Sequence, residues 1–431
     1  MIRTLYEDLL SWKNSKNRKP LVLFGARQVG KTWLLKEFGK NEYQQMAYIN
    51  CDNNPALKQA FGDFNIERLI RVFSALSEIN IQKETTLIIL DEIQEIPLAL
   101  TSLKYFCEEA PEYHIAVAGS MLGVSVHNGT GYPVRKVDEL KLLPMSFKEF
   151  LMAGGKDVLL KTLEDQRWED ISVLCESYKD LLRQYYYTGG MPEVVDCYYS
   201  SHDLSETRKI QTRIIEDYYR DFSKHIPANL LTKVRLVYSS IPAQLAKENK
   251  KFIYSILKKG SRAKDYEDAI QWLIDAGLIY KVPRISKIAM PVKNYEDPAA
   301  FKLFLNDLGL LGAMNEVPAA QILVKDNIFE EFKGSFTEQY VLQEIIASGL
   351  KPYYYSNDSS SLEIDFVTQK EKVYPIEVKA EENLKSKSLK TVIGNDTNLV
   401  GWRFSMSNYR DQKWMINVPL YSIREWLEKA K

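Results

Sequence analysis

The stretch Leu21-Val-Leu-Phe24-Gly25-Ala-Arg-Gln-Val-Gly30-Lys31-Thr32 decides the fold of the first part of the chain. Its first four residues are all apolar, which indicates a strand that is buried on both faces. The remainder fits the pattern G-x-x-x-x-G-K-[ST], and a helix-like pattern follows from Trp33 to Phe38. A strand, a glycine-rich loop and a helix in this order let backbone N–H groups surround phosphate oxygens. The sequence therefore predicts a phosphate-binding loop.

The residue types of this loop suit a nucleoside triphosphate with Mg²⁺. Glycine allows the backbone to approach phosphate without a clash from Cβ. Lys31 is expected on the β- and γ-phosphates, and Thr32 is expected to offer its hydroxyl to Mg²⁺. Other residues expected to contact the nucleotide are Gly25, Arg27, Gln28, Val29, Gly30 and Trp33. The alternative is a chance match in an ordinary strand–turn–helix.

Three more apolar runs, separated by helix-like patterns, are Met46–Asn50, Thr86–Leu90 and His114–Ala118. Such an alternation predicts a parallel sheet covered by helices on both faces, an α/β architecture. Asp91 and Glu92 follow the third run, at the carboxyl end of a strand, where such sheets bind ligands. We expect Asp91 to support Mg²⁺ and Glu92 to activate the attacking water. The alternative role for two acids there is a helix cap.

Further polar residues are weaker candidates for the same site. Ser120 follows the run His114–Ala118 and is expected to orient the attacking water, with simple turn chemistry as the alternative. Arg135 could act as an arginine finger, and Arg27 could touch phosphate instead, although a single arginine is more often a surface charge. A finger can come from a second copy of the chain, so a homo-oligomer or ring stays open.

Composition limits the class of protein. The chain has 431 residues with 57 basic and 57 acidic side chains, so its net charge is zero. This balance disfavours a protein that coats nucleic acid along its whole surface. No apolar run approaches the roughly 18 residues of a membrane span, and acidic residues near the N-terminus disfavour a signal peptide. Four separated cysteines and four scattered histidines favour a reducing cytoplasm and disfavour zinc.

Several motifs together resemble a large prokaryotic family of AAA+-type ATPases. In that family, the ATPase domain is joined to a C-terminal domain of unknown function with a restriction-endonuclease-like core. The matching motifs are the phosphate loop, Leu90–Gln94, Gly119-Ser120, Leu143–Phe150, Gly189–Pro192, Phe304–Leu310, Gly334–Glu338 and Ile376–Lys379. The resemblance implies ATP binding and a DNA-linked role. One departure is Pro133-Val134 before Arg135, where the family commonly has Gly-Arg.

The middle of the chain contains a basic stretch. From Lys247 to Lys264 there are seven basic residues against Glu248, a net charge of +6. Helix patterns at Phe252–Leu257 and Asp265–Ala276, followed by the strand-like Leu278–Val282, give the order of a winged helix, which the resemblance supports. We expect contacts with DNA phosphates through residues 247–264. The alternative is the solvated face of a spacer or docking module.

Two acids and a lysine near the C-terminus form a second candidate site. Leu362–Thr368 and Val373–Val378 form a predicted hairpin, with Gln369–Lys372 as the turn, and this folding would bring Asp365 beside Glu377. Adjacent carboxylates favour a bound metal ion, and Lys379 could stabilise developing charge during phosphodiester hydrolysis.

The pattern Asp…Glu-x-Lys resembles the restriction-endonuclease-like signature, and Glu338 is a further candidate ligand. Alternatives are an inactive inherited site or an ordinary hairpin with an ion pair. Lys385, Lys387 and Lys390 could meet a phosphate backbone or form a solvated helix face.

The sequence thus predicts an α/β protein in consecutive segments. They are a P-loop ATPase domain (1–155), a helical segment (156–232), a winged-helix-like domain (233–295) and a restriction-endonuclease-like domain (296–431). Two functions stay open. One is an ATPase that drives DNA cleavage through Asp365, Glu377 and Lys379. The other is a nucleotide-controlled switch whose tail binds DNA or protein without cutting.

Overall fold

The computed structural model describes residues 2–120, 122–127, 131–247, 250–323, 330–380, 386–394 and 399–430. Internal contacts divide the chain into two compact units. Unit 1 comprises Met1–Leu143 together with Trp272–Leu278, and unit 2 comprises Pro144–Gln271 together with Ile279–Lys431. The segments predicted from sequence are consecutive along the chain. They do not include a return of the chain to unit 1 at Trp272–Leu278.

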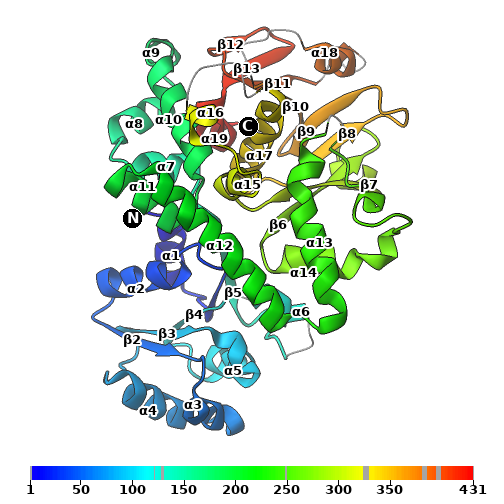
Figure 1. The fold of residues 1–431 in the computed structure, drawn as a ribbon. Coiled ribbons are helices and arrows are strands. Elements are labelled where there is room, and N and C mark those ends of the chain that lie inside the picture. Colours follow the sequence, from blue (N-terminus) through cyan, green and yellow to red (C-terminus); the bar gives the residue numbers. More distant parts are fainter. Residues whose placement is uncertain are drawn as a thin grey trace. The chain divides into compact units, whose positions relative to one another are not determined.

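Unit 1 contains a five-stranded parallel sheet with the strand order β2-β3-β4-β1-β5 (Figure 1). The strands are β1 (Leu21–Phe24), β2 (Gln45–Asn50), β3 (Thr86–Asp91), β4 (His114–Ala118) and β5 (Asp138–Lys141). The predicted strands and their parallel arrangement are confirmed. The sequence gives no sign of β5, because half of its residues are exposed and it lacks an apolar run.

Helices cover both faces of this sheet. They are α1 (Leu5–Lys13), α2 (Lys31–Glu42), α3 (Pro55–Ala60), α4 (Ile66–Ser77), α5 (Pro97–Glu109) and α6 (Leu122–His127). Figure 1 shows α1 and α2 on one side of the sheet and α3, α4 and α5 on the other. The face toward α4 and α5 buries Val22, Ile88 and Ile115 against Phe73 and Phe106. Burial on both faces explains why these strands are apolar throughout.

Unit 2 begins with helices. They are α7 (Phe147–Ala153), α8 (Asp157–Glu164), α9 (Trp168–Val173), α10 (Cys175–Thr188), α11 (Pro192–Ser201), α12 (Leu204–His225) and α13 (Ala228–Leu245). The predicted break near 188–192 separates α10 from α11, because Gly189 adopts a positive φ of 69° and Pro192 begins the next helix. Helix α14 (Glu267–Asp275) follows, and its last turn belongs to unit 1.

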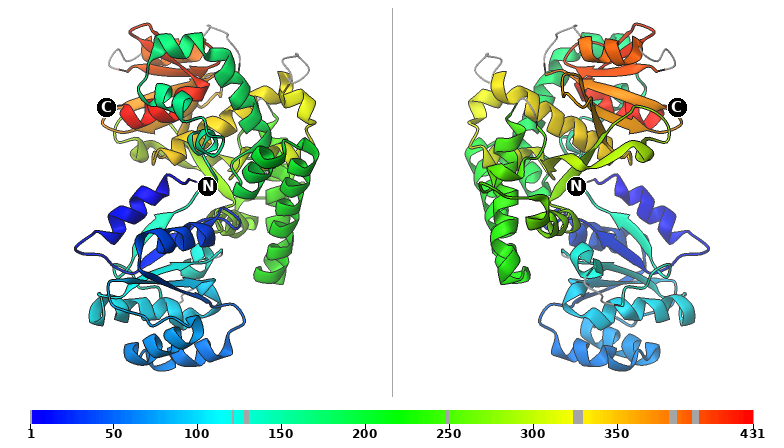
Figure 2. Two further views of the ribbon diagram at one scale, coloured as in Figure 1. Left: turned by 90° about the vertical axis from the view of Figure 1, so that its left-hand side faces the viewer. Right: turned by 90° about the vertical axis from the view of Figure 1, so that its right-hand side faces the viewer.

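The rest of unit 2 is built on an eight-stranded mixed sheet with the order β12-β13-β11-β10-β9-β8-β6-β7 (Figure 2). The strands are β6 (Ile279–Ile285), β7 (Glu296–Leu305), β8 (Tyr353–Ser356), β9 (Glu363–Gln369), β10 (Val373–Val378), β11 (Gly401–Ser405), β12 (Arg410–Asp411) and β13 (Met415–Pro419). The helices are α15 (Leu308–Met314), α16 (Ala319–Leu323), α17 (Glu330–Ala347), α18 (Lys387–Gly394) and α19 (Ile423–Lys429). Helix α18 packs on β9 and β10, α17 contacts β10, and α19 contacts β13.

The predicted hairpin is confirmed as β9 and β10, but the predicted helix at Phe252–Leu257 is wrong. Only a short 3₁₀ turn, Tyr254–Ile256, forms there. The Phe252 N–H donates to the Phe301 carbonyl at 2.9 Å, and the two rings stack with centroids 5.6 Å apart. These contacts with β7 hold Phe252 outside a helix. The predicted limit between residues 295 and 296 falls between β6 and β7, which pair with each other.

Two further expectations concern the whole chain. In the part of the chain that the structure describes, no helix combines the length and apolar character needed to cross a bilayer. Cys51, Cys107, Cys175 and Cys197 are all free thiols.

Candidate functional site

The phosphate loop lies between β1 and α2, as predicted. Helix α2 begins at Lys31, and Gly30 before it has a φ of 94°. Gly25 is also required, because a Cβ at this position would lie 2.4 Å from the Leu142 carbonyl oxygen. Gln28 adopts a positive φ of 66°, which is uncommon for a residue with a side chain. The loop is therefore tightly curled, with the N-terminus of α2 at its end.

Lys31 is buried at the mouth of this loop. Its Nζ donates to the carbonyl oxygens of Gly25 at 2.8 Å and Ala26 at 2.7 Å. Burial lowers the pKa of Lys31 to about 8, although the charges of Glu92 and Asp91 oppose this shift. Phosphate oxygens are stronger acceptors than carbonyls, so a nucleotide can draw this ammonium away from the loop backbone.

Thr32 and Asp91 meet beside Lys31. The Thr32 hydroxyl donates to Asp91 Oδ2 at 2.7 Å, and the Tyr48 hydroxyl donates to the same oxygen at 3.0 Å. A hydroxyl and a carboxylate are the hard oxygen ligands that Mg²⁺ uses while it keeps several waters. The two residues predicted to hold Mg²⁺ are thus adjacent, and their chemistry fits the ion.

Glu92 and Ser120 also come together. Glu92 Oε2 accepts hydrogen bonds from Ser120 Oγ at 3.1 Å, from Ser120 N at 3.3 Å and from Gln94 Nε2 at 2.6 Å. Burial raises the pKa of Glu92, but the hydrogen bonds from Gln94 and Ser120 and the charge of Lys31 hold it below its usual value. The carboxylate is therefore ionised near neutral pH, as a proton acceptor must be.

The other predicted loop residues differ in exposure. Arg27 is exposed, Gln28 is half-buried and Trp33 is 43% exposed, whereas the Val29 side chain is fully buried. The Val29 carbonyl accepts a hydrogen bond from buried Arg3 at 2.7 Å, and Arg3 also reaches the Leu143 carbonyl at 2.6 Å. Arg3 thus braces the loop, a role that no local sequence pattern indicates.

Arg135 precedes the amino-terminal end of β5, whereas the phosphate loop follows the carboxyl end of β1. Strand β5 is parallel to β1, with Asp138 opposite Leu21 and Lys141 opposite Phe24. Arg135 precedes Asp138, so at about 3.3 Å per residue it is roughly 10 Å or more from the carboxyl edge that carries the loop. The register therefore places Arg135 away from the phosphate loop of its own chain. The finger role stays a prediction that needs a second copy of the chain.

A cavity of about 500 Å³ opens beside the loop in unit 1. Gly25 and Ser120 line one part of it, and Asp275 and Gly277 line another. Gly277 has a φ of 72°, and a Cβ there would lie 3.3 Å from the Ala26 nitrogen. Gly277 follows the end of α14 and therefore permits close approach of the chain to the loop.

The C-terminal hairpin brings Asp365 and Glu377 together. Strand β9 pairs with β10 so that Phe366 lies opposite Ile376, which places Asp365 beside Glu377. Asp365 Oδ2 accepts a hydrogen bond from the Val378 N–H at 2.7 Å. Lys379 forms an ion pair of 3.1 Å with Glu377. The juxtaposition predicted from strand alternation is present.

Two lysines that the sequence did not indicate also enter this site. Lys250 forms a close ion pair with Glu338 of α17. Lys302 of β7 is fully buried, pairs with Glu363 at 2.5 Å and lies 3.9 Å from Glu338. These lysines neutralise part of the acidic charge, and only the fold brings them to it.

The charges of this cluster shift its pKa values. Burial and the charge of Glu338 raise the pKa of Asp365 to about 7, against the effect of Lys302. Burial raises the pKa of Glu338, but the charges of Lys250 and Lys302 hold it below its usual value. The cluster is therefore a mixed network of anions and cations.

A metal ion fits this network in part. Glu377 Oε2 and Glu338 Oε2 are buried and have no hydrogen-bond partner among the described residues. No group of three or more His, Cys, Asp or Glu residues in those parts of the chain is arranged to hold a metal. Mg²⁺ needs only one or two carboxylates when waters and phosphates complete its shell. Asp365 and Glu377 could supply that pair.

The basic stretch 247–264 divides into two kinds of residue. Lys250 turns inward to Glu338, while Lys258, Lys259, Arg262 and Lys264 are exposed. Glu248 lies outside the described residues, as does Lys385. Lys387 and Lys390 are exposed on α18. The exposed cations remain candidates for phosphate contact, whereas Lys250 already has a partner.

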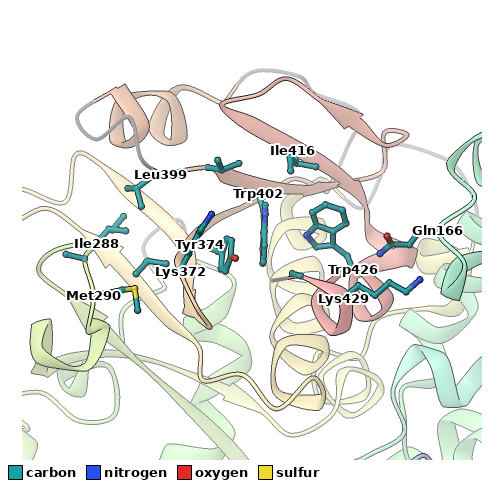
Figure 3. A pocket seen from close by; sticks show the side chains of 14 residues that line it. Gln166, Ile288, Met290, Lys372, Tyr374, Leu399, Trp402, Ile416, Trp426 and Lys429 are labelled. Atoms are coloured by element: carbon teal, nitrogen blue, oxygen red, sulfur yellow. The ribbon is translucent and has the colours of Figure 1, made fainter.

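A separate cavity of about 590 Å³ in unit 2 is lined by aromatic side chains (Figure 3). Tyr374 and Trp402 stack there with centroids 3.9 Å apart, and Trp426 lies edge-on to Trp402 at 6.0 Å. Lys372 and Lys429 also line it. None of the residues predicted for either site lines this cavity.

One further motif of the resemblance has a structural role. Buried Asp307 accepts hydrogen bonds from the Gly190 N–H at 2.6 Å and the Leu310 N–H at 2.9 Å. It therefore caps α15 and fastens the Gly189-Gly190 turn to it. A Cβ on Gly189 would lie 2.3 Å from Asp307, so the two motifs require each other.

Three family models match consecutive parts of the chain. Residues 17–151 match an AAA domain. This part of the chain is therefore similar to P-loop ATPases of the AAA type. Residues 179–321 and 333–421 match two domains of unknown function, DUF8612 and DUF4143. The AAA match and the loop geometry agree on an ATPase-like nucleotide site, while the other two matches assign no activity. No curated protein matches the chain significantly.

Several solved structures resemble the chain at low identity. The Walker-type ATPase PABY2304 of Pyrococcus abyssi is 15% identical, over 73% of this chain and 96% of its own, with a TM-score of 0.44. Orc1 of Aeropyrum pernix, solved with DNA, is 15% identical over 74% and 92%, with a TM-score of 0.27. A signal-transduction ATPase with a tetratricopeptide-repeat sensor, PH0952 of Pyrococcus horikoshii, is 14% identical over 80% and 45%, with a TM-score of 0.30. TM-scores below 0.5 support no functional inference.

Proposed function

We propose that the protein binds and hydrolyses ATP with Mg²⁺ at the phosphate loop. The observation that carries this proposal is the convergence of Lys31, the Thr32–Asp91 pair and the Glu92–Ser120 pair. Lys31 holds the β- and γ-phosphates, Thr32 and Asp91 hold the metal, and Glu92 accepts a proton from the attacking water. Bound Mg²⁺ neutralises phosphate charge as it develops.

Replacing Asp91 with asparagine tests the metal part of this proposal. We expect ATP affinity in excess Mg²⁺ to fall about 10-fold or more, because a charged metal-site ligand is lost. Affinity in EDTA should change little. The measurement is titration with a fluorescent ATP analogue, with and without Mg²⁺. Equal Mg²⁺ dependence in the wild type and the variant would contradict the role of Asp91.

We further propose that ATP hydrolysis drives a DNA-related task through unit 2. From the family resemblance described above, we propose that unit 2 contains a winged-helix part and a restriction-endonuclease-like part. The adjacency of Asp365 and Glu377, the nearby Lys379 and the unpartnered Glu377 Oε2 support a metal-dependent phosphodiesterase site. The exposed cations Lys258 and Lys259 would contact the DNA backbone.

A second candidate function is a nucleotide-controlled switch that does not cut DNA. Its supporting observation is the pairing of Lys250 and Lys302 with the acidic cluster. Internal ammonium groups already neutralise charge that a divalent metal would otherwise neutralise. In this case, unit 2 binds DNA or a protein partner as the nucleotide state changes.

Replacing Glu377 with alanine separates the two candidates. For the nuclease, we expect Mg²⁺- or Mn²⁺-dependent cutting of single-stranded, duplex or branched DNA that the variant loses by about 100-fold or more. Glu371→Ala, in the exposed turn of the same hairpin, is the matched control. If the wild type cuts no substrate with ATP, ADP or no nucleotide, the switch is favoured.

A further inference from the structure

A side chain outside the predicted site makes the shortest contact with the proposed catalytic acid. Gln94 Nε2 donates to Glu92 Oε2 at 2.6 Å, which is shorter than either bond from Ser120. A carboxylate only accepts, so the amide must present its NH₂ group to Glu92. Among the described residues, every hydrogen bond to this carboxylate falls on Oε2. Oε1 is thereby left to accept a proton from water.

The backbone is arranged to bring these two side chains together. Glu92 adopts a positive φ of 50°, an uncommon conformation for a residue with a side chain. It begins the 3₁₀ turn Ile93–Glu95, which carries Gln94 back toward it. Strained backbone of this kind persists where a site requires one geometry.

Gly119 provides the space that Gln94 occupies. A Cβ at position 119 would lie 1.9 Å from Gln94 Oε1 and 3.0 Å from Leu122 Cγ. Gln94 Oε1 is buried and has no hydrogen-bond partner among the described residues. Such an orphaned acceptor is destabilising, which argues against a role in stability alone.

We propose that Gln94 is a positioning residue that holds Glu92 Oε2, so that Oε1 faces the attacking water. The assignment rests on the proposed ATP hydrolysis and adds to it the residue that orients its base. Gly119 acts with Gln94, because it admits the amide beside the end of β4.

Replacing Gln94 with alanine is the test. We expect kcat for ATP hydrolysis to fall about 10- to 100-fold, while ATP affinity changes less than about twofold. A merely structural role would not lower kcat while leaving ATP affinity unchanged. Glu95→Ala, in the same 3₁₀ turn, should leave both kcat and ATP affinity unchanged.

A double-variant cycle tests the part of Gly119. Gly119→Ala should lower kcat as Gln94→Ala does, because its methyl group displaces the amide. The double variant should be no slower than either single variant, since the clash disappears when the amide is removed. Thermal unfolding checks that each variant is folded, and Gln94→Ala carries the test alone if Gly119→Ala is not.

The outcomes separate the two proposals. A wild type that hydrolyses ATP beside an equally active or faster Gln94→Ala variant overturns the positioning role only. Additive losses in the double variant overturn the role of Gly119. A wild type without ATP hydrolysis overturns the proposed function, and the assignment of Gln94 falls with it.

Discussion

Replacing Lys31 with alanine is expected to lower ATP hydrolysis about 100-fold or more, and to weaken nucleotide binding as well. The ammonium is preorganised at the loop mouth, where it donates to the Gly25 and Ala26 carbonyls. A fixed charge aimed at the transferring phosphate typically contributes an effect of this size. Burial of Lys31 strengthens it, because little water screens the interaction. The measurements are steady-state ADP release and titration with a fluorescent ATP analogue in Mg²⁺.

Lys40→Ala is the matched control for this prediction. Lys40 lies on the same helix, α2, but is exposed and pairs with Glu37 at 3.5 Å. Its loss should leave hydrolysis and binding within about twofold of the wild type, since exposed helix ion pairs contribute little. If Lys31→Ala retains full nucleotide affinity in Mg²⁺, the assignment of the phosphate loop is wrong.

Replacing Asp307 with alanine is expected to destabilise unit 2 by about 3 kcal/mol. Asp307 caps α15 and holds the Gly190 N–H, and both donors lie in a buried region. Each buried donor left unsatisfied costs about 1–3 kcal/mol. The measurement is denaturant unfolding followed by tryptophan fluorescence. Asp203→Ala is the control, because Asp203 caps α12 in the same way but on the surface, where a cap contributes about 1 kcal/mol. An equal effect of the two variants would contradict the buried role.

Asp307 also makes the free energy of unfolding depend on pH. Burial raises its pKa to about 6 from an ordinary value of 3.8, against hydrogen bonds from three backbone N–H groups. Its contribution to the free energy of unfolding is therefore fully present below about pH 4 and is lost as pH rises through about 6. Asp307→Asn cannot titrate, so its stability relative to the wild type should rise by up to about 3 kcal/mol between pH 4 and 7. A constant difference over this range would contradict the raised pKa.

The nucleotide site could be predicted because its determinants are local. A few consecutive residues are enough to recognise the loop Gly25–Thr32. The same is true of the strand end at Asp91 and Glu92. Parallel strands then bring these segments to one edge of the sheet, where Thr32 meets Asp91 and Ser120 meets Glu92. Strand alternation likewise placed Asp365 beside Glu377 without any knowledge of the rest of unit 2.

The parts that could not be predicted depend on distant contacts. Lys250 reaches Glu338 across 88 residues, and Lys302 reaches Glu363 across 61. The local sequence around each lysine is like that around a solvent-exposed lysine. Only the folded structure shows that Lys250 and Lys302 neutralise part of the acidic cluster. Phe252 fails to continue a helix because it pairs with Phe301 of β7. Tertiary contact overrides local pattern at both places.

The proposed role of Gln94 could not be predicted from the sequence either. The sequence marks Leu90–Gln94 as a motif, but it does not show which way the Gln94 side chain points. The left-handed Glu92 backbone and the space at Gly119 decide that. Both are conformational facts that a pattern of residue types does not contain.

Glu92 is the group that we propose acts on water at a bound nucleotide. Glu92→Gln keeps the shape of the side chain but removes its ability to take a proton. The most direct measurement is therefore ATP binding and ADP release by the wild type and Glu92→Gln in the same Mg²⁺ buffer. We predict that both bind ATP with similar affinity and that only the wild type releases ADP, with the variant slower by about 100-fold or more. Equal ADP release by both proteins, or binding by neither, would contradict the account.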